Sequence, residues 1–182
     1  MIVPTSRPQQ KRDISERYLL KAGVRDKVCL LGVRGYYLNT MGKRNQNDRG
    51  IYDDAMFVVS PTAYVSYNAN TDPSVQRKGI ATLITGLYRY KKGRHGISHG
   101  KGYPALRPAT KDEALPVMRD GDGNESVGYN INIHRGGYNT TSSLGCQTIP
   151  PTQWDSFIAL VYGEMDRYQQ STIPYLLVEQ KN

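Results

Sequence analysis

Short apolar or alternating runs, separated by Gly, Pro, Asn and Asp, fill most of the chain after residue 27. This pattern is typical of β-strands joined by turns, because strand side chains point alternately to the two faces of a sheet. The segment 120–124, DGDGN, predicts a hairpin turn, because Gly and Asn tolerate the positive φ angles of tight turns. The runs predict strands at residues 28–33, 55–60, 63–68, 86–90, 114–119 and 128–134.

Two segments have helical periodicity instead. After a pair of prolines, which favour a helix start, apolar residues from Trp154 to Met165 recur at steps of three or four. They predict one amphipathic helix packed on the sheet. A second, short helix is expected at 15–22, with Ser15 as its N-cap.

The remaining segments predict loops and one edge strand. Residues 39–49 and 91–107 are long, polar and glycine-bearing, so both are expected to run over the surface, where long loops often line sites. The apolar run 175–178 follows Pro174 and predicts a last strand at a sheet edge, because proline cannot donate a hydrogen bond to a central ladder.

The length of 182 residues fits one domain. A hydrophobic fraction of 38% excludes an intrinsically disordered chain, and no apolar run approaches the roughly 20 residues of a membrane-spanning helix. The alternation of apolar runs and turns divides the chain into an N-terminal arm with a short helix, 1–26, and a β-rich domain with a C-terminal helix, 27–182. Residues 1–13 predict a mobile arm, and they lack the apolar stretch of a secretory signal.

The net charge of +8 predicts attraction to polyanions. The basic residues are scattered and no known nucleic-acid-binding signature accompanies them, whereas the anionic envelope of bacteria fits the charge equally well. The only two cysteines, Cys29 and Cys146, exclude a disulfide framework and a zinc site built from cysteines alone. Cys29 lies in an apolar run and is expected to pack in the core, although a disulfide between the two cysteines stays open.

The candidate chemistry lies in residues 128–149, GYNINIHRGGYNTTSSLGCQTI. A predicted strand ends with His134, and a polar loop then leads to Cys146. An adjacent imidazole can take the proton of a thiol and lower the thiol pKa, which activates a cysteine nucleophile. Gly145 permits a tight turn, and the amides from Ser143 to Cys146 are the candidates for an oxyanion hole.

The motif HRGG followed by SSLGC resembles the His-Gly and Ser-His-Gly-Cys motifs of the L,D-transpeptidase (YkuD-like) catalytic domain. The resemblance implies a β-sandwich with one or two packed helices, and an enzyme that acts on peptidoglycan stem peptides next to diaminopimelate. It implies that Cys146 is the nucleophile, that His134 is the base, and that the carbonyl of Arg135 orients the imidazole. Ser143 and Gly145 match the serine and glycine of the motif.

Two positions depart from the family pattern. Leu144 stands where a second histidine is usual, and Thr148 stands where an arginine usually helps to hold the substrate. A threonine has neither the charge nor the fork with which arginine binds a carboxylate. We therefore expect hydrolysis rather than cross-linking, by a phage-type endolysin that is made in the cytoplasm without a signal peptide. It would reach the cell wall in the periplasm by holin- or virion-type delivery.

Two other functions stay open. One is an L,D-transpeptidase or L,D-carboxypeptidase that exchanges or trims terminal D-amino acids, and the other is a non-catalytic wall-binding or virion protein. Peptidoglycan is the expected partner of a monomeric chain, with no nucleic acid, stable membrane insertion, cofactor or metal. His95 and His99 have a spacing that zinc ligands use, but their Gly-rich and Lys-rich loop predicts a flap beside the cleft.

Tyrosines are the expected substrate contacts, because they combine an apolar face with a hydroxyl tip. Asp53 and Asp54 are adjacent, so on a strand they would point to opposite faces, and structural hydrogen bonds are expected rather than a glycosidase pair. The residues predicted to bind substrate are Tyr103 on the flap, Tyr129 and Tyr138 beside the motif, Ser143 and Thr148.

Overall fold

The computed structural model describes residues 2–180, so Met1, Lys181 and Asn182 of the two expected segments lie outside the described residues. The fold is mainly β with two α-helices, as the pattern of apolar positions predicted. The helices are α1 (Arg12–Lys21) and α2 (Pro151–Arg167). The strands are β1 (Cys29–Arg34), β2 (Asp54–Val59), β3 (Tyr64–Ala69), β4 (Ala81–Leu83), β5 (Gly86–His95), β6 (Tyr103–Pro108), β7 (Ala114–Arg119), β8 (Glu125–Tyr129), β9 (Ile133–Arg135), β10 (Gln147–Ile149) and β11 (Thr172–Glu179).

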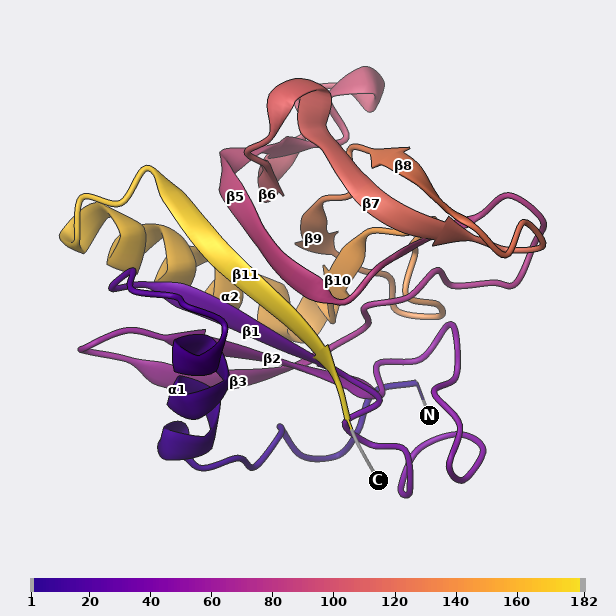
Figure 1. The fold of residues 1–182 in the computed structure, drawn as a ribbon, viewed down its shortest axis with the longest axis horizontal. Coiled ribbons are helices and arrows are strands. Elements are labelled where there is room, and N and C mark those ends of the chain that lie inside the picture. The colour runs from indigo at the N-terminus through magenta and orange to yellow at the C-terminus, as the bar shows by residue number, and fades with distance from the viewer. Residues whose placement is uncertain (1, 181–182) are drawn as a thin grey trace.

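Eight strands form one large sheet in the order β10-β9-β6-β5-β11-β1-β2-β3. The sheet curves until its two outer strands meet, because Asn70, directly after β3, forms an antiparallel bridge with Thr148 of β10. The sheet is therefore nearly closed. A smaller sheet, β4-β7-β8, lies beside it and is seen at the upper right of Figure 1.

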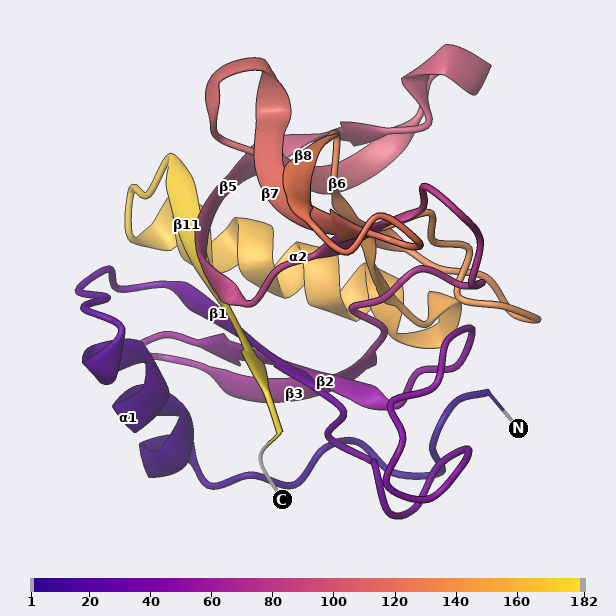
Figure 2. The ribbon, with the colours of Figure 1, turned by 45° about the vertical axis from the view of Figure 1, so that its right-hand side comes forward.

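The two helices cover opposite faces of the large sheet (Figure 2). All five apolar residues that predicted the C-terminal helix are buried in the main core, which confirms that prediction. Helix α1 closes a smaller core on the other face, where Leu19 joins Leu31 and Phe57. Both faces of the central strands are thus withdrawn from water, which is the main source of their stability.

The N-terminal segment differs from its prediction. Helix α1 begins at Arg12, and Ser15 is buried inside it, where its hydroxyl lies 2.9 Å from that of Tyr64, so it is not the N-cap. The expected mobile arm is instead tied to the sheet, because the side-chain amide of Asn68 in β3 donates to the carbonyl of Ser6 (3.1 Å). A segment without apolar periodicity is ordered here by hydrogen bonds to the remainder of the chain.

The prediction of a surface loop at 91–107 is wrong. This segment contains most of a β5–β6 hairpin whose last pair is His95 with Tyr103, and only the tip between them is irregular. The strand expected at 128–134 is two strands, because the chain turns at Asn130 with φ 56° between β8 and β9. Strands β4 and β10 have three residues each, too few for a visible alternation.

Strand β11 lies in the middle of the large sheet, so the expected edge position is wrong. Pro174 pairs with Arg89 of β5, whereas pairing with β1 begins one residue later, at Tyr175. Pro174 therefore has a paired strand on one side only, as a residue in an edge strand does.

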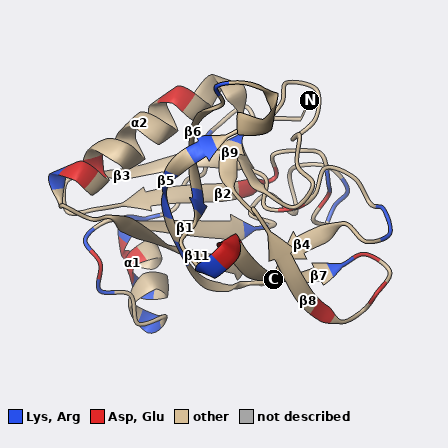
Figure 3. Cartoon of the chain, turned by 90° about the horizontal axis from the view of Figure 1, so that it is seen from above, with Lys and Arg blue, Asp and Glu red and all other residues tan. Residues whose placement is uncertain are grey.

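Charged residues of both signs are interspersed over helices, strands and loops in the view of Figure 3. The surface charge therefore offers diffuse attraction to an anionic polymer in this view rather than one basic stripe. Within residues 2–180, neither helix has the length and hydropathy that crossing a bilayer requires.

Candidate active site

Two hydrogen-bonded parallel strands place the candidate nucleophile and the candidate base two residues apart in register. In the register of β9 and β10, Thr148 pairs with His134, and the amide of Gln147 donates to the carbonyl of Asn132 (2.8 Å). Cys146 directly precedes β10 and so lies beside Asn132. The sheet thus joins two residues that the sequence separates by a polar loop.

His134 is buried and oriented by its own strand. Its Nδ1 lies 2.7 Å from the carbonyl oxygen of Arg135 and 3.2 Å from the hydroxyl of Tyr103. Because a carbonyl only accepts hydrogen bonds, Nδ1 carries the proton and Nε2 keeps a free lone pair. Burial, together with the charge of a nearby histidine, His95, lowers the pKa of His134 to about 4. At neutral pH this imidazole is therefore an uncharged base.

A second imidazole stacks on the first. The rings of His95 and His134 lie 3.9 Å apart between centroids, with an angle of 7° between their planes. Nδ1 of His95 lies 3.1 Å from the side-chain nitrogen of Asn132. The sequence pattern predicts a flap at His95 and gives no sign of this contact, because the β5–β6 hairpin is needed to bring the two histidines together.

The surroundings of Cys146 favour the protonated thiol. The side chain of Cys146 is partly exposed, and its Sγ donates to the carbonyl oxygen of Asn130 over 3.5 Å. Burial raises the thiol pKa to about 11, although the backbone amide of Asn132 and the charge of Arg107 both act to lower it. The expected lowering of the cysteine pKa is therefore wrong. A neutral thiol and a neutral imidazole on paired segments fit general-base catalysis, in which the proton moves as the sulfur attacks.

The loop before the cysteine is held by one hydroxyl. The buried Ser143 donates through Oγ to the carbonyl of Cys146 (2.7 Å) and accepts from the amide of Gly145 (3.0 Å). Gly145 has a φ of 131°, and a Cβ there would lie 2.6 Å from the carbonyl oxygen of Ala81, so only glycine fits. The amide of Gly145 is thus engaged and does not serve the oxyanion, and Ser143 shapes the turn instead of binding substrate.

The expected substrate contacts separate into two groups. Thr148 is fully buried and exchanges both backbone hydrogen bonds with Asn70, so its predicted contact with substrate is wrong. Tyr103 is half-buried, and its hydroxyl donates to the carbonyl of Arg135 (3.3 Å) beside Nδ1 of His134. Tyr129 and Tyr138 are 59% and 74% exposed, and both can meet a large ligand.

Arg107 is a cation whose charge acts to lower the pKa of the Cys146 thiol. It binds Glu113 through two nitrogens, and it also donates to the carbonyl of Arg94 (3.0 Å) and to the side-chain oxygen of Asn130 (2.7 Å). Asn130 therefore meets Arg107 with its side chain and the thiol of Cys146 with its carbonyl. No motif in the sequence around Arg107 marks this residue as part of the site.

The other candidate groups are structural. Both cysteines are free, so the disulfide between them does not form. Asp54 accepts from the amides of Gly35 (2.5 Å) and Thr71 (2.6 Å), and Asp53 accepts from that of Asp48 (2.9 Å), as expected of structural hydrogen bonds. In residues 2–180, no three His, Cys, Asp or Glu side chains gather in a way that could hold a metal ion.

Protonation of His134 is expected to destabilise the fold in acid. Its pKa is about 4 in the folded protein, against 6.5 for an ordinary histidine, so between these values the unfolded chain binds the extra proton. The free energy of unfolding should fall as the pH drops from 6.5 to 4, by on the order of 2 kcal/mol. Urea unfolding over a series of pH values, for the parent and His134→Gln, measures this contribution.

The comparison with His134→Gln removes the other titrations. Burial raises the pKa of Asp53 and of Asp54, which gives a slope of the opposite sign in both proteins. Only the difference between the two curves therefore belongs to His134. Parallel curves would contradict a buried, neutral imidazole.

No model of a known protein family matches the chain, and neither a curated protein nor a solved structure matches it. The function is therefore inferred from the residues around His134 and Cys146.

Proposed function

We propose that this chain is a cysteine-dependent peptidoglycan hydrolase that cleaves stem peptides next to diaminopimelate, as a phage-type lysis enzyme. Its mainly β fold would then be a β-sandwich of L,D-transpeptidase type. One observation carries the proposal. His134 is locked as a neutral base by the carbonyl of Arg135, on a strand paired with the one that Cys146 precedes.

The proposed reaction has two halves. The Sγ of Cys146 attacks the peptide carbonyl carbon while Nε2 of His134 takes the thiol proton, and a tetrahedral oxyanion forms. Collapse of the oxyanion breaks the C–N bond, and the leaving amine receives the proton from His134. Water then attacks the thioester with His134 as base, which releases a carboxylate and restores the thiol.

Hydrolysis is favoured over cross-linking by the position of Thr148. A buried threonine stands where the resemblance leads us to expect a substrate-binding arginine, so a guanidinium that could hold a second stem peptide is missing from that position. The exposed Tyr129 and Tyr138, together with Leu144 (68% exposed), offer apolar surface for the wall polymer. The net charge of +8 adds long-range attraction to an anionic wall.

Digestion of purified sacculi followed by mass spectrometry of the soluble products tests the proposal. We expect new free termini next to diaminopimelate, and none in a matched wall that carries lysine at that position. New cross-linked dimers would indicate a transpeptidase, and loss of only the terminal D-amino acid would indicate a carboxypeptidase. Binding to sacculi without products would indicate a wall-binding protein.

A further inference from the structure

Asn132 has a polar atom that the fold leaves without a partner. The residue is 3% exposed, its side-chain nitrogen lies 3.1 Å from Nδ1 of His95, and its Oδ1 has no hydrogen-bond partner among the described residues. Buried polar groups are almost always paired, so a free one inside a candidate active site calls for an explanation.

The position of Asn132 is next to the nucleophile. Asn132 and His134 are two apart on one extended segment, so their side chains share a face. Cys146 lies beside Asn132, directly before the neighbouring strand β10, and the backbone amide of Asn132 is close enough to the sulfur to lower its pKa. Asn132 therefore lies between Cys146 and the stacked pair of His95 and His134.

Two arrangements satisfy the contact between Asn132 and His95. If Nδ1 of His95 is unprotonated, the amide nitrogen donates to it and the amide oxygen remains unpaired. If Nδ1 carries the proton, it donates to the amide oxygen after a half-turn of the amide about χ2, and the two N–H groups are then free. The second arrangement presents a donor rather than an acceptor to the site.

Two of the backbone amides expected to bind the oxyanion are already engaged, that of Gly145 by Ser143 Oγ (3.0 Å) and that of Ser143 by Ser74 Oγ (2.7 Å), so a side-chain donor would add to the remaining amides. We propose that the side-chain amide of Asn132 donates a hydrogen bond to the oxyanion formed when Cys146 attacks a carbonyl, and that His95 is the positioning residue that orients this amide. The inference rests on the proposed function for its natural substrate, and it concerns the chemistry of the same site. Side-chain amides fill this role where they are fixed before the reaction.

Two small probes separate the oxyanion from the thiol. With p-nitrophenyl acetate, the sulfur bonds to the carbonyl carbon, p-nitrophenolate leaves with the electron pair, and the thiol proton passes through His134 to solvent, so an oxyanion forms on the way. With iodoacetamide, the sulfur displaces iodide directly from a saturated carbon, and no oxyanion forms. Mass spectrometry of proteolytic peptides assigns both reactions to Cys146, because Cys29 is buried.

In Asn132→Ala and Asn132→Asp, acetylation of Cys146 is expected to slow by about 10- to 100-fold, while alkylation stays within about twofold of the parent. The aspartate variant keeps the shape and an acceptor but lacks the donor, so its loss distinguishes donation from simple packing. His95→Phe keeps a stacked ring without Nδ1, and a smaller loss in acetylation alone is expected. Unchanged acetylation in both Asn132 variants would overturn the proposal, as would equal losses with both probes.

The outcome is independent of the wall substrate. If Cys146 of the parent is acetylated, the Asn132 variants are acetylated more slowly, and the parent leaves sacculi intact, then the proposed function fails and the oxyanion role stands. If the parent cleaves sacculi and the Asn132 variants cleave them equally fast with unchanged KM and kcat, the oxyanion role fails and the hydrolase stands. Thermal melting of each variant, expected within a few degrees of the parent, shows that the fold is retained.

Discussion

Replacing Cys146 by alanine is expected to reduce the release of wall peptides by about 10³-fold or more, because the covalent step loses its nucleophile. No other thiol can replace it. Cys29 is buried, donates to the carbonyl of Asp26 (3.2 Å), and has its pKa raised to about 12 by burial. Release of soluble muropeptides from sacculi, measured by chromatography, gives the rate.

Cys29→Ala is the matched control, and it should cleave sacculi at the parental rate. Binding of Cys146→Ala to sacculi should persist, since the exposed Tyr129 and Tyr138 are unchanged. Cleavage by Cys146→Ala at the parental rate would exclude a cysteine mechanism. If parent and variant both bind sacculi and neither cleaves them, the chain is a wall-binding protein.

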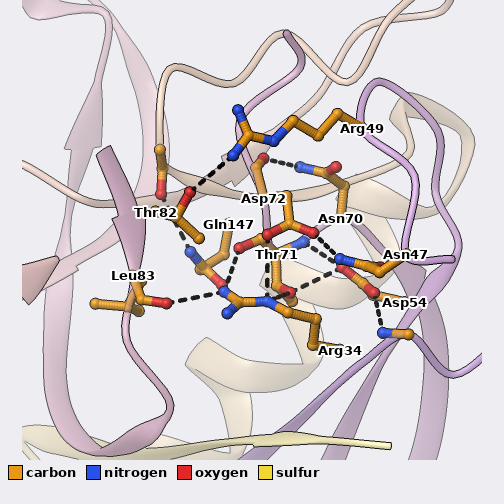
Figure 4. A network of polar contacts seen from close by, with 12 residues as sticks. Arg34, Asn47, Arg49, Asp54, Asn70, Thr71, Asp72, Thr82, Leu83 and Gln147 are labelled. Carbon is orange, nitrogen blue, oxygen red and sulfur yellow. Dashed lines mark hydrogen bonds and ion pairs between the residues drawn. The ribbon is translucent and has the colours of Figure 1, made fainter. Parts of the chain in front are cut away.

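Arg34→Ala is expected to lower the free energy of unfolding by about 3–5 kcal/mol, a large part of the stability of a domain this size. Arg34 ends β1 and is 7% exposed. Its guanidinium binds the carboxylate of Asp72 (3.2 Å) and the carbonyls of Thr71 (2.8 Å) and Leu83 (2.9 Å), as Figure 4 shows. Removing it leaves a buried carboxylate and two carbonyls without their partner.

Urea unfolding measures this loss, and Arg17→Ala is its control. Arg17 forms an exposed ion pair with Asp13 at 3.8 Å on α1, and such pairs contribute little. We expect the control to lie within about 0.5 kcal/mol of the parent. A loss of similar size in the two variants would show that the buried network around Arg34 does not hold β1 to the 70–72 segment.

The parts of the site that could be predicted are those encoded within one short segment. His134, Gly145 and Cys146 lie within one motif, and the glycine is required by a local φ angle and a close backbone contact. Helix α2 was equally visible, because a periodicity of three to four residues is repeated over its whole length.

The parts that could not be predicted depend on strand pairing. His95 reaches His134 only because β6 lies between β5 and β9, an order that no local pattern contains. Arg107 acts on Cys146 through the same arrangement. The thiol pKa was expected in the wrong direction, because burial is a property of the folded sheet and here it outweighs the nearby cation.

An incoming peptide cannot join the strand of the nucleophile as an added strand. Strand β10 is paired with β9 on one side, and on the other Thr148 exchanges both backbone hydrogen bonds with Asn70. Recognition by β-augmentation needs an open edge and matches the regular backbone of an L-peptide. With that mode blocked at β10, a ligand that reaches Cys146 meets side chains on the face of the sheet instead of the backbone of a strand edge.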